Sequence, residues 1–155
     1  MSNRFNAVTQ EDARILRDIV GENNLLFNDA DRMVAYSSDE SGHGHSAAPE
    51  IVVKPQTTEQ ISLMAKHCNA RNIPITARGA GSGLAGGAIP LFGGVVVSFE
   101  KMSAILEIDT ENMVAVVEPG VVTNDLCIRV AEDGLFYAGY PMSVQSSFIG
   151  GNVAC

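Results

Sequence analysis

The stretch Arg78-Gly79-Ala80-Gly81-Ser82-Gly83-Leu84-Ala85-Gly86-Gly87-Ala88 is the most informative part of this 155-residue sequence. It follows an apolar run, and most of its residues have little or no side chain. Glycine adopts positive φ angles without steric cost, so consecutive N–H groups can turn to one side and bind an anion. A hydrogen bond to a charged group contributes about 1.5–3 kcal/mol. A flexible surface turn is the plainer interpretation, but a turn rarely needs five glycines within nine residues. We therefore expect these amides to hold a diphosphate without a lysine.

The same stretch matches the G-x-G-x-x-G fingerprint of the dinucleotide-binding Rossmann fold at Gly81, Gly83 and Gly86. Glu100 stands near the place where that fold has its ribose-binding acid. A Rossmann unit also needs a helix from the second glycine to the next strand. The residues in that space disrupt helices, namely Gly86, Gly87, Pro90, Gly93 and Gly94. Proline in a helix interior costs about 3 kcal/mol and glycine about 1 kcal/mol. The sequence thus predicts an irregular loop and excludes the Rossmann fold.

Helices and strands alternate along the rest of the chain. Helical spacing and capping residues predict three helices, from a Thr9 cap to Gly21, from Thr57 or Thr58 through Cys68, and from a Thr123 cap to about Asp133. Apolar runs predict strands over 51–53, 73–77, 95–99, 105–109 and 114–118, with a turn at 110–112 between the last two. Residues 37–49 are expected to form a loop, and 136–155 mainly a ligand-contacting loop. The pattern predicts an α+β (mixed α/β) fold with antiparallel pairing in its later part. We divide it into a lead-in segment, 1–50, and a domain, 51–155.

The composition and charge of the sequence argue against several classes of function. The net charge of −8 and the pI near 4.7 argue against a nucleic-acid partner, which would need a surplus of basic residues. No apolar run is long enough for a membrane span, and the first residues do not resemble a secretory signal. Cys68, Cys127 and Cys155 are scattered and odd in number, which favours reduced thiols in the cytoplasm. His43-Gly44-His45, near Asp39 and Glu40, has some character of a metal site, but its Gly-Ser surroundings favour a solvated loop and no metal.

Two further segments carry features of a binding site. Glu118-Pro119-Gly120-Val121 lies between a strand and a helix, in a tight corner that would expose backbone amides. Gly139-Tyr140-Pro141-Met142-Ser143, followed by Ser146-Ser147-Phe148-Ile149-Gly150-Gly151-Asn152, offers hydroxyls, glycine amides and a side-chain amide. A solvated loop would not need the apolar pair Phe148-Ile149 beside two glycines. We interpret both segments as ligand-contacting.

These three motifs, in this order and spacing, resemble the FAD-linked oxidases of the vanillyl-alcohol-oxidase (PCMH-type) superfamily. Within it, the sequence looks most like the branch of the glycolate oxidase catalytic subunit and D-lactate dehydrogenase. The resemblance runs from about Tyr36 to the last residue. It implies the N-terminal part only of a PCMH-type FAD-binding domain.

Carried onto this sequence, the resemblance implies that the FAD pyrophosphate lies on the backbone of residues 79–83. Gly87 and Ala88 would lie near the isoalloxazine ring or ribityl chain. The cofactor-binding residues implied in this way are Arg78, Gly79, Ala80, Gly81, Ser82, Gly83, Leu84, Gly87, Ala88, Pro119, Gly120, Val121, Pro141, Ser143, Ser147, Gly150, Gly151 and Asn152. Covalently flavinylated relatives carry a His in the first glycine loop. None stands between Arg78 and Ala88, so non-covalent FAD is expected.

The resemblance also implies the activity, the oxidation of a 2-hydroxy acid such as glycolate or D-lactate by hydride transfer to FAD. Many members have an acidic residue where Tyr140 stands, which loosens the match to any one substrate class. The family's catalytic His and substrate-binding Arg belong to a region beyond Cys155, so no catalytic residue is expected within these 155 residues, and the chain alone is expected to be inactive. A second copy of the chain and an electron-acceptor subunit are both open as partners. The alternative is a non-catalytic α/β module that needs a partner chain to complete its fold.

Overall fold

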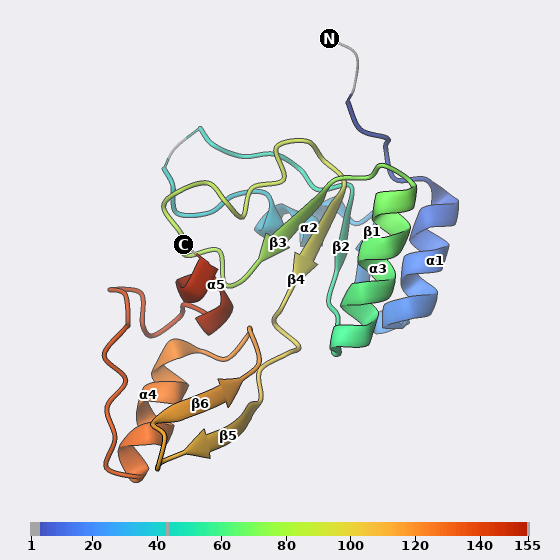
Figure 1. Ribbon diagram of the computed structural model, residues 1–155. Coiled ribbons are helices and arrows are strands. Elements are labelled where there is room, and N and C mark those ends of the chain that lie inside the picture. The colour runs from blue at the N-terminus through green and yellow to red at the C-terminus, as the bar shows by residue number, and fades with distance from the viewer. Residues whose placement is uncertain (1–3, 43, 155) are drawn as a thin grey trace.

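The computed structural model describes residues 4–42 and 44–154, which form two lobes (Figure 1). The larger lobe is built on a four-stranded sheet in the order β1 (Leu25–Phe27), β2 (Ile51–Val53), β4 (Val95–Ser98) and β3 (Ile75–Arg78). Strands β2, β4 and β3 are parallel, and β1 is antiparallel to β2. The smaller lobe combines an antiparallel hairpin with a helix. This arrangement confirms the predicted α+β class with antiparallel pairing in the later part.

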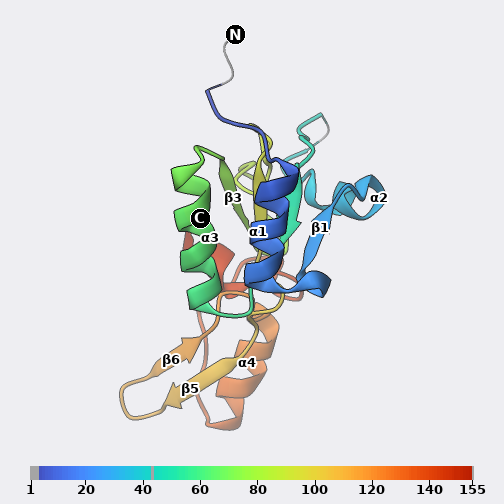
Figure 2. The same cartoon turned by 90° about the vertical axis from the view of Figure 1, so that its right-hand side faces the viewer.

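Helices cover both faces of the large sheet, as Figure 2 shows. Helices α1 (Gln10–Val20) and α3 (Thr58–Ala70) lie on one face; α2 (Ala30–Met33) and the 3-10 turn Val34–Tyr36 lie on the other. Because side chains alternate along a strand, Val52 and Val96 pack toward α2. Their neighbours pack toward α1 and α3 in one cluster, whose strand members are Leu25, Ile51, Val53, Val95 and Val97. Strands covered on both faces are expected to be continuously apolar, which explains the Val-rich runs.

The smaller lobe consists of β5 (Ile105–Asp109), β6 (Val114–Val117) and α4 (Thr123–Glu132). The predicted turn at 110–112 is present, and the Asp109 carboxylate accepts hydrogen bonds from the backbone and side-chain nitrogens of Asn112 at 2.9 and 2.7 Å. The core of this lobe is made of Val121, Leu126, Val130 and Ile149. Ile149 opens a short helix, α5 (Ile149–Ala154), which lies between the loop after β3 and the smaller lobe (Figure 1).

Several helix ends agree with the sequence. The Thr9 hydroxyl accepts from the Asp12 amide, and the Asp12 carboxylate accepts from the Thr9 amide, so α1 begins with a complete capping box. Gly21 ends α1 at a φ of 89°. Thr57, rather than Thr58, caps α3.

Other expectations were wrong. Thr123 does not cap α4: it is the first helical residue, and its hydroxyl contacts Ser147 instead. The stretch predicted to be mainly loop is loop over residues 136–148, as expected, but a helix that was not predicted, α5, occupies 149–154 despite its two glycines. Strand β3 starts only at Ile75, because Pro74 interrupts the predicted run. Strand β1 was not predicted, since three residues are too few to show a period.

A buried carboxylate joins α1 to α3. Asp12 is 1% exposed, and its Oδ1 lies 2.9 Å from Nε2 of His67 and 3.0 Å from Nε of Arg71. Burial opposes the ionisation of Asp12, but hydrogen bonds from Arg71, Thr9 and His67 outweigh it and hold the pKa of Asp12 well below its usual 3.8. The bonds from Asp12 to His67 and Arg71 thus hold α1 and α3 against each other on one face of the sheet.

Asp12→Asn is expected to lower the free energy of unfolding by about 1–3 kcal/mol, the range for losing the charged member of a buried hydrogen-bonded group. Because the folded-state pKa of Asp12 is depressed, its stabilisation is present above the unfolded pKa and is lost as the pH falls below about 4. Urea unfolding of both proteins at several pH values between about 3 and 7 measures the loss of stability and its dependence on pH.

The matched control is Asp18→Asn on the same helix, whose side chain is 66% exposed and pairs with Arg14. It is expected to change the stability by less than about 1 kcal/mol. Equal losses for the two variants, or a pH dependence that Asp12→Asn leaves unchanged, would contradict the account.

Candidate functional site: the amide-lined loop and its neighbours

The loop between β3 and β4 contains no helix, which confirms the exclusion of a Rossmann unit. Gly81 and Gly86 both have a φ of +77°, as expected of glycines that turn the chain sharply. Among the described residues, the backbone amides from Ala80 to Gly87 have no hydrogen-bond acceptor. Most of this stretch is exposed or half-buried. A run of amides without acceptors is suited to bind an anion.

Gly83 and Gly87 have open space beside them. A Cβ placed on either residue would meet no atom within 4 Å, and neither has a positive φ that excludes larger residues. The sequence therefore has glycine at two positions where the fold itself does not require it. These two positions therefore leave room for a ligand to come close to the backbone.

The Arg78 side chain does not extend toward this open surface. Arg78 is 7% exposed, and its guanidinium donates to the carbonyl oxygens of Ser38 and Ala35 at 2.8 and 3.0 Å. Burial lowers the pKa of Arg78, while the charge of Asp39 opposes that shift, so the guanidinium stays charged at neutral pH. The role of residues 35–39 could not be predicted from the sequence, because every residue has a backbone carbonyl whatever its type.

The second and third motifs meet at a tight corner. The Gly150 amide donates to the Pro119 carbonyl at 2.9 Å, and the Ile149 amide donates to the Val121 carbonyl at 2.9 Å. A Cβ on Gly150 would lie 2.7 Å from Cβ of Pro119. At Gly120, a Cβ would overlap the carbonyl oxygen of Phe99. These two glycines are thus required by close packing of the backbone.

A small polar network holds the corner together. The Thr123 hydroxyl lies 2.9 Å from the Ser147 hydroxyl, and Nδ2 of Asn152 donates to Thr123 Oγ1 at 2.6 Å. Thr123 and Ser147 are buried. The side chains of Ser147 and Asn152 are therefore engaged inside the protein. Gly151 differs from them, since a Cβ there would meet nothing within 4 Å.

All three motifs come together through Phe148. A Cβ on Gly79, at the start of the amide-lined loop, would lie 3.5 Å from Cβ of Phe148, the residue before Ile149. Phe148 also forms an isolated bridge with Val122, next to the second motif. The glycine loop, the Pro119 corner and the start of α5 therefore form one continuous region.

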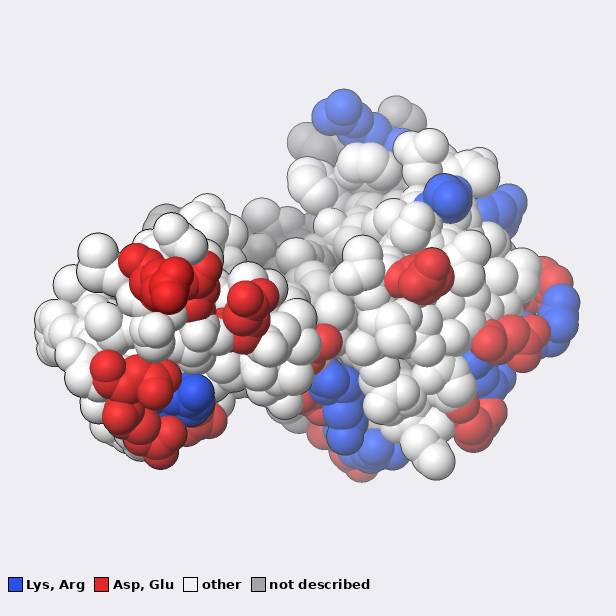
Figure 3. Space-filling model, turned by 60° about the horizontal axis from the view of Figure 1, so that its bottom comes forward, with Lys and Arg blue, Asp and Glu red and all other residues white. Residues whose placement is uncertain are grey.

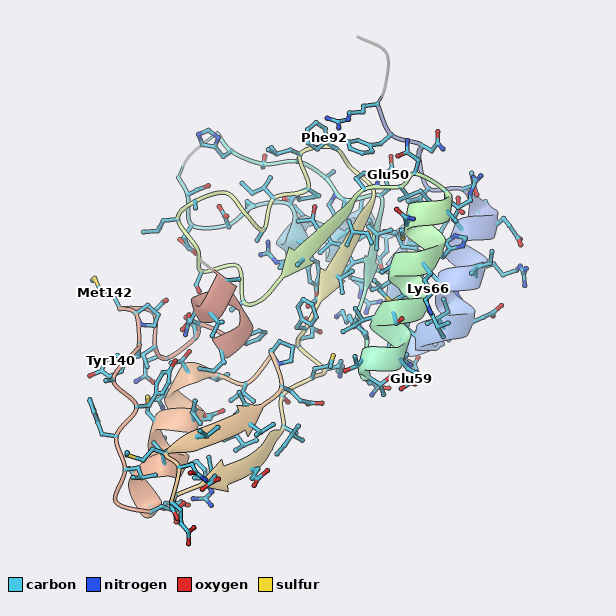
Figure 4. The ribbon with its side chains drawn as sticks, viewed as in Figure 1. Glu50, Glu59, Lys66, Phe92, Tyr140 and Met142 are labelled. Atoms are coloured by element: carbon cyan, nitrogen blue, oxygen red, sulfur yellow. The ribbon has the colours of Figure 1, made fainter. Side chains whose placement is uncertain are left out.

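The loop between α4 and α5 places two other residues on the outside. Met142 is fully exposed, and Tyr140 is 48% exposed and packs edge-on against Phe136, with ring centroids 6.2 Å apart. Figure 4 shows both on the outer side of this loop, away from α5. Pro141 and Ser143, in the same loop, are half-buried.

The charge distribution distinguishes the two lobes. Seven acidic residues stand against one arginine between residues 104 and 135, and Figure 3 shows acidic side chains gathered over the smaller lobe. Such a surface repels a phosphate. In the region described here, the amides of the glycine loop are the groups that suit one.

The described residues contain no cluster of three His, Cys, Asp or Glu side chains with metal-binding geometry. His43 lies outside the described part, so the interpretation of His43-Gly44-His45 stays a prediction. None of the helices in residues 4–42 and 44–154 has the length and apolar character that a membrane span requires.

Several curated proteins are similar to this chain, and one of them is named as an FAD-linked oxidoreductase. The chain is 44% identical over 136 residues to an uncharacterized FAD-linked oxidoreductase of Mycobacterium tuberculosis, covering 88% of this chain and 29% of the relative. It is 39% identical over 146 residues to the glycolate oxidase subunit GlcD of Bacillus subtilis, covering 94% and 31%. It is 35% identical over 151 residues to a D-lactate dehydrogenase of Anaerostipes hadrus, covering 97% and 31%. The chain thus spans less than a third of the length of these relatives.

Solved structures share the fold. Alkyldihydroxyacetonephosphate synthase superposes with a TM-score of 0.82 over 95% of this chain and 29% of its own, at 20% identity. A p-cresol methylhydroxylase structure with bound substrate gives a TM-score of 0.71 over 90% of this chain and 29% of its own, at 28% identity. These neighbours confirm the PCMH-type architecture.

The family model of the FAD binding domain matches residues 49–155, which include the glycine loop, the Pro119 corner and α5. FAD is the cofactor of this family, and a loop of free amides beside open glycines fits its diphosphate. The chain belongs to the FAD-binding domain family of FAD-linked oxidoreductases.

Proposed function

We propose that this chain supplies the diphosphate-binding part of the FAD site in an oxidoreductase that oxidises a 2-hydroxy acid of the glycolate or D-lactate class. The observation that carries the proposal is the run of amides from Ala80 to Gly87 without acceptors, beside the open positions Gly83 and Gly87. Relatives named as glycolate oxidase subunit and D-lactate dehydrogenase support the substrate class.

In this proposal, the residues divide the work. The amides of 79–83 bind the diphosphate, and Gly87 and Ala88 lie along the ribityl chain or the ring. Pro119, Gly120 and Val121 support the adenosine side, while Pro141, Ser143, Gly150 and Gly151 border the flavin. Ser147 and Asn152 act indirectly, since their side chains hold Thr123.

The bound flavin supplies hydride acceptance, and the protein supplies orientation and electrostatics. The amides contribute partial positive charges that are fixed before the ligand arrives, so little reorganisation is needed on binding. The boundary at residue 50 between lead-in segment and domain and the inactivity of the 155 residues alone stay predictions. So does the cytoplasmic location, which the free thiols of Cys68 and Cys127 favour.

A second candidate function has a specific observation in its favour. One side of the β5–β6 hairpin faces outward, with Leu106 63%, Val114 51% and Val116 44% exposed. Apolar surface of this kind marks a protein contact. A non-catalytic module that associates with a partner chain would explain it, and light scattering of the protein at its native length distinguishes a monomer from an assembly.

Gly83→Val is expected to weaken FAD binding on the order of tenfold to a hundredfold, the effect of losing about one hydrogen bond to a charged group. The fold accepts the side chain, since a Cβ at Gly83 meets nothing within 4 Å. Titration of FAD into cofactor-free protein, followed by flavin fluorescence, measures the Kd.

The control is Ala70→Val, at an exposed position at the end of α3 and outside all three motifs. It is expected to leave the Kd unchanged. Wild-type affinity for Gly83→Val at unchanged melting temperature would refute the placement of FAD on this loop.

Non-covalent attachment is also expected, because residues 78–88 include neither His nor Cys. Precipitation of the purified native-length protein with acid should leave all of the flavin in the supernatant. A pellet that stays yellow and carries the mass of FAD on a tryptic peptide would contradict this expectation.

The substrate class is tested with the native-length protein loaded with FAD and an artificial dye as electron acceptor. Glycolate or D-lactate is expected to reduce the dye, with L-lactate as the mirror-image control. Equal rates with both lactates would contradict the preference for the D form. No rate with any hydroxy acid while FAD is bound would show that the substrate class is wrong, and either result would leave the FAD site standing.

A further inference from the structure

The guanidinium of Arg78 lies inside the glycine loop and not on its surface. Besides Ser38 and Ala35, it reaches the carbonyl oxygen of Ala88 at 3.5 Å. Residues 78 and 88 are the two ends of the loop, so this one side chain connects its beginning to its end. The ring of Tyr36 lies beneath the guanidinium, 5.7 Å from ring centroid to Cζ.

The loop is fitted closely around this group. A Cβ on Gly81 would overlap Nη2 of Arg78 and lie 2.7 Å from its Cζ. Gly81 is therefore required twice, by its positive φ and by the passage of its backbone over the guanidinium.

Residues 35–40 bind both the Arg78 side chain and the glycine loop. The Ala35 and Ser38 carbonyls accept from Arg78, and the Glu40 amide donates to the Gly83 carbonyl at 3.1 Å. None of these hydrogen bonds uses a backbone amide of residues 80–87. These bonds thus shape the loop and leave its anion-binding groups free.

We propose that Arg78 is a positioning residue for the FAD diphosphate: its buried guanidinium joins both ends of the glycine loop to the segment 35–39 and so holds the amides of 80–87 in place before the cofactor binds. This inference rests on the proposed function. It changes the role of Arg78 from a cofactor contact to the support beneath the contacts.

Arginine suits this role better than lysine. Its planar guanidinium has five N–H donors in fixed directions and can donate to acceptors on several sides, whereas the ammonium group of lysine is a compact charge at one position. A loop that is ordered in advance also avoids part of the entropy loss on binding. Loss of the guanidinium should therefore appear as weaker cofactor binding and not only as lower stability.

The test is Arg78→Lys in the native-length protein. This substitution keeps the positive charge and removes the planar guanidinium with its several donors. The Kd for FAD is expected to rise tenfold or more, which corresponds to about 1.4 kcal/mol. In FAD-free protein, limited proteolysis is expected to cut faster between residues 80 and 87. Gly81→Ala, which displaces the guanidinium from the loop side, is expected to give the same two changes and serves if Arg78→Lys does not fold.

The matched control is Arg71→Lys, which weakens the pair with Asp12 away from the loop. It is expected to lower the melting temperature without changing the FAD affinity or the cleavage of the loop. A wild-type Kd and cleavage rate for both Arg78→Lys and Gly81→Ala would overturn the proposal.

Gly83→Val, measured beside them, separates the two proposals. Weaker binding by Gly83→Val together with normal binding by Arg78→Lys would overturn the role of Arg78 alone. Normal binding by all three variants would overturn the FAD site on the loop as well.

Discussion

The proposed cofactor site depends on the backbone amides of residues 80–87, which have no acceptor among the described residues and lie in the loop between the parallel strands β3 and β4. Strands β3 and β4 pair in register from Ile75 with Val95 to Arg78 with Ser98, so both ends of the intervening loop are fixed by the sheet. Unpaired amides are costly when buried and inexpensive when exposed, which explains why the stretch from Ala80 to Gly87 stays mostly at the surface. The chain thus keeps a group of donors ready for an anion.

The rest of the fold supports that loop from two sides. The larger lobe provides the strands, with helices α1 and α3 locked by Asp12 on one face. The smaller lobe provides the corner at Pro119 and the helix α5, which reaches the loop through Phe148 and Gly79. Distant parts of the sequence therefore converge on one region.

The sequence predicts much of this arrangement because its information is local. Val-rich runs indicate β2 and β4, Thr9 and Thr57 mark helix starts, and Gly86, Gly87 and Pro90 rule out a helix after the glycine loop. Contacts between distant backbones were beyond reach. The carbonyls of Ala35 and Ser38 accept from Arg78, and Thr123 turns to Ser147 instead of capping α4. Neither contact follows from residue type, since any residue offers a carbonyl and a threonine before a helix is usually a cap.

Hydrogen exchange of the backbone amides with and without FAD tests the central claim most directly. The account predicts that FAD slows exchange across residues 80–87 and leaves the hairpin turn at 110–113 unchanged. Equal exchange in residues 80–87 with and without saturating FAD would show that the cofactor diphosphate binds elsewhere.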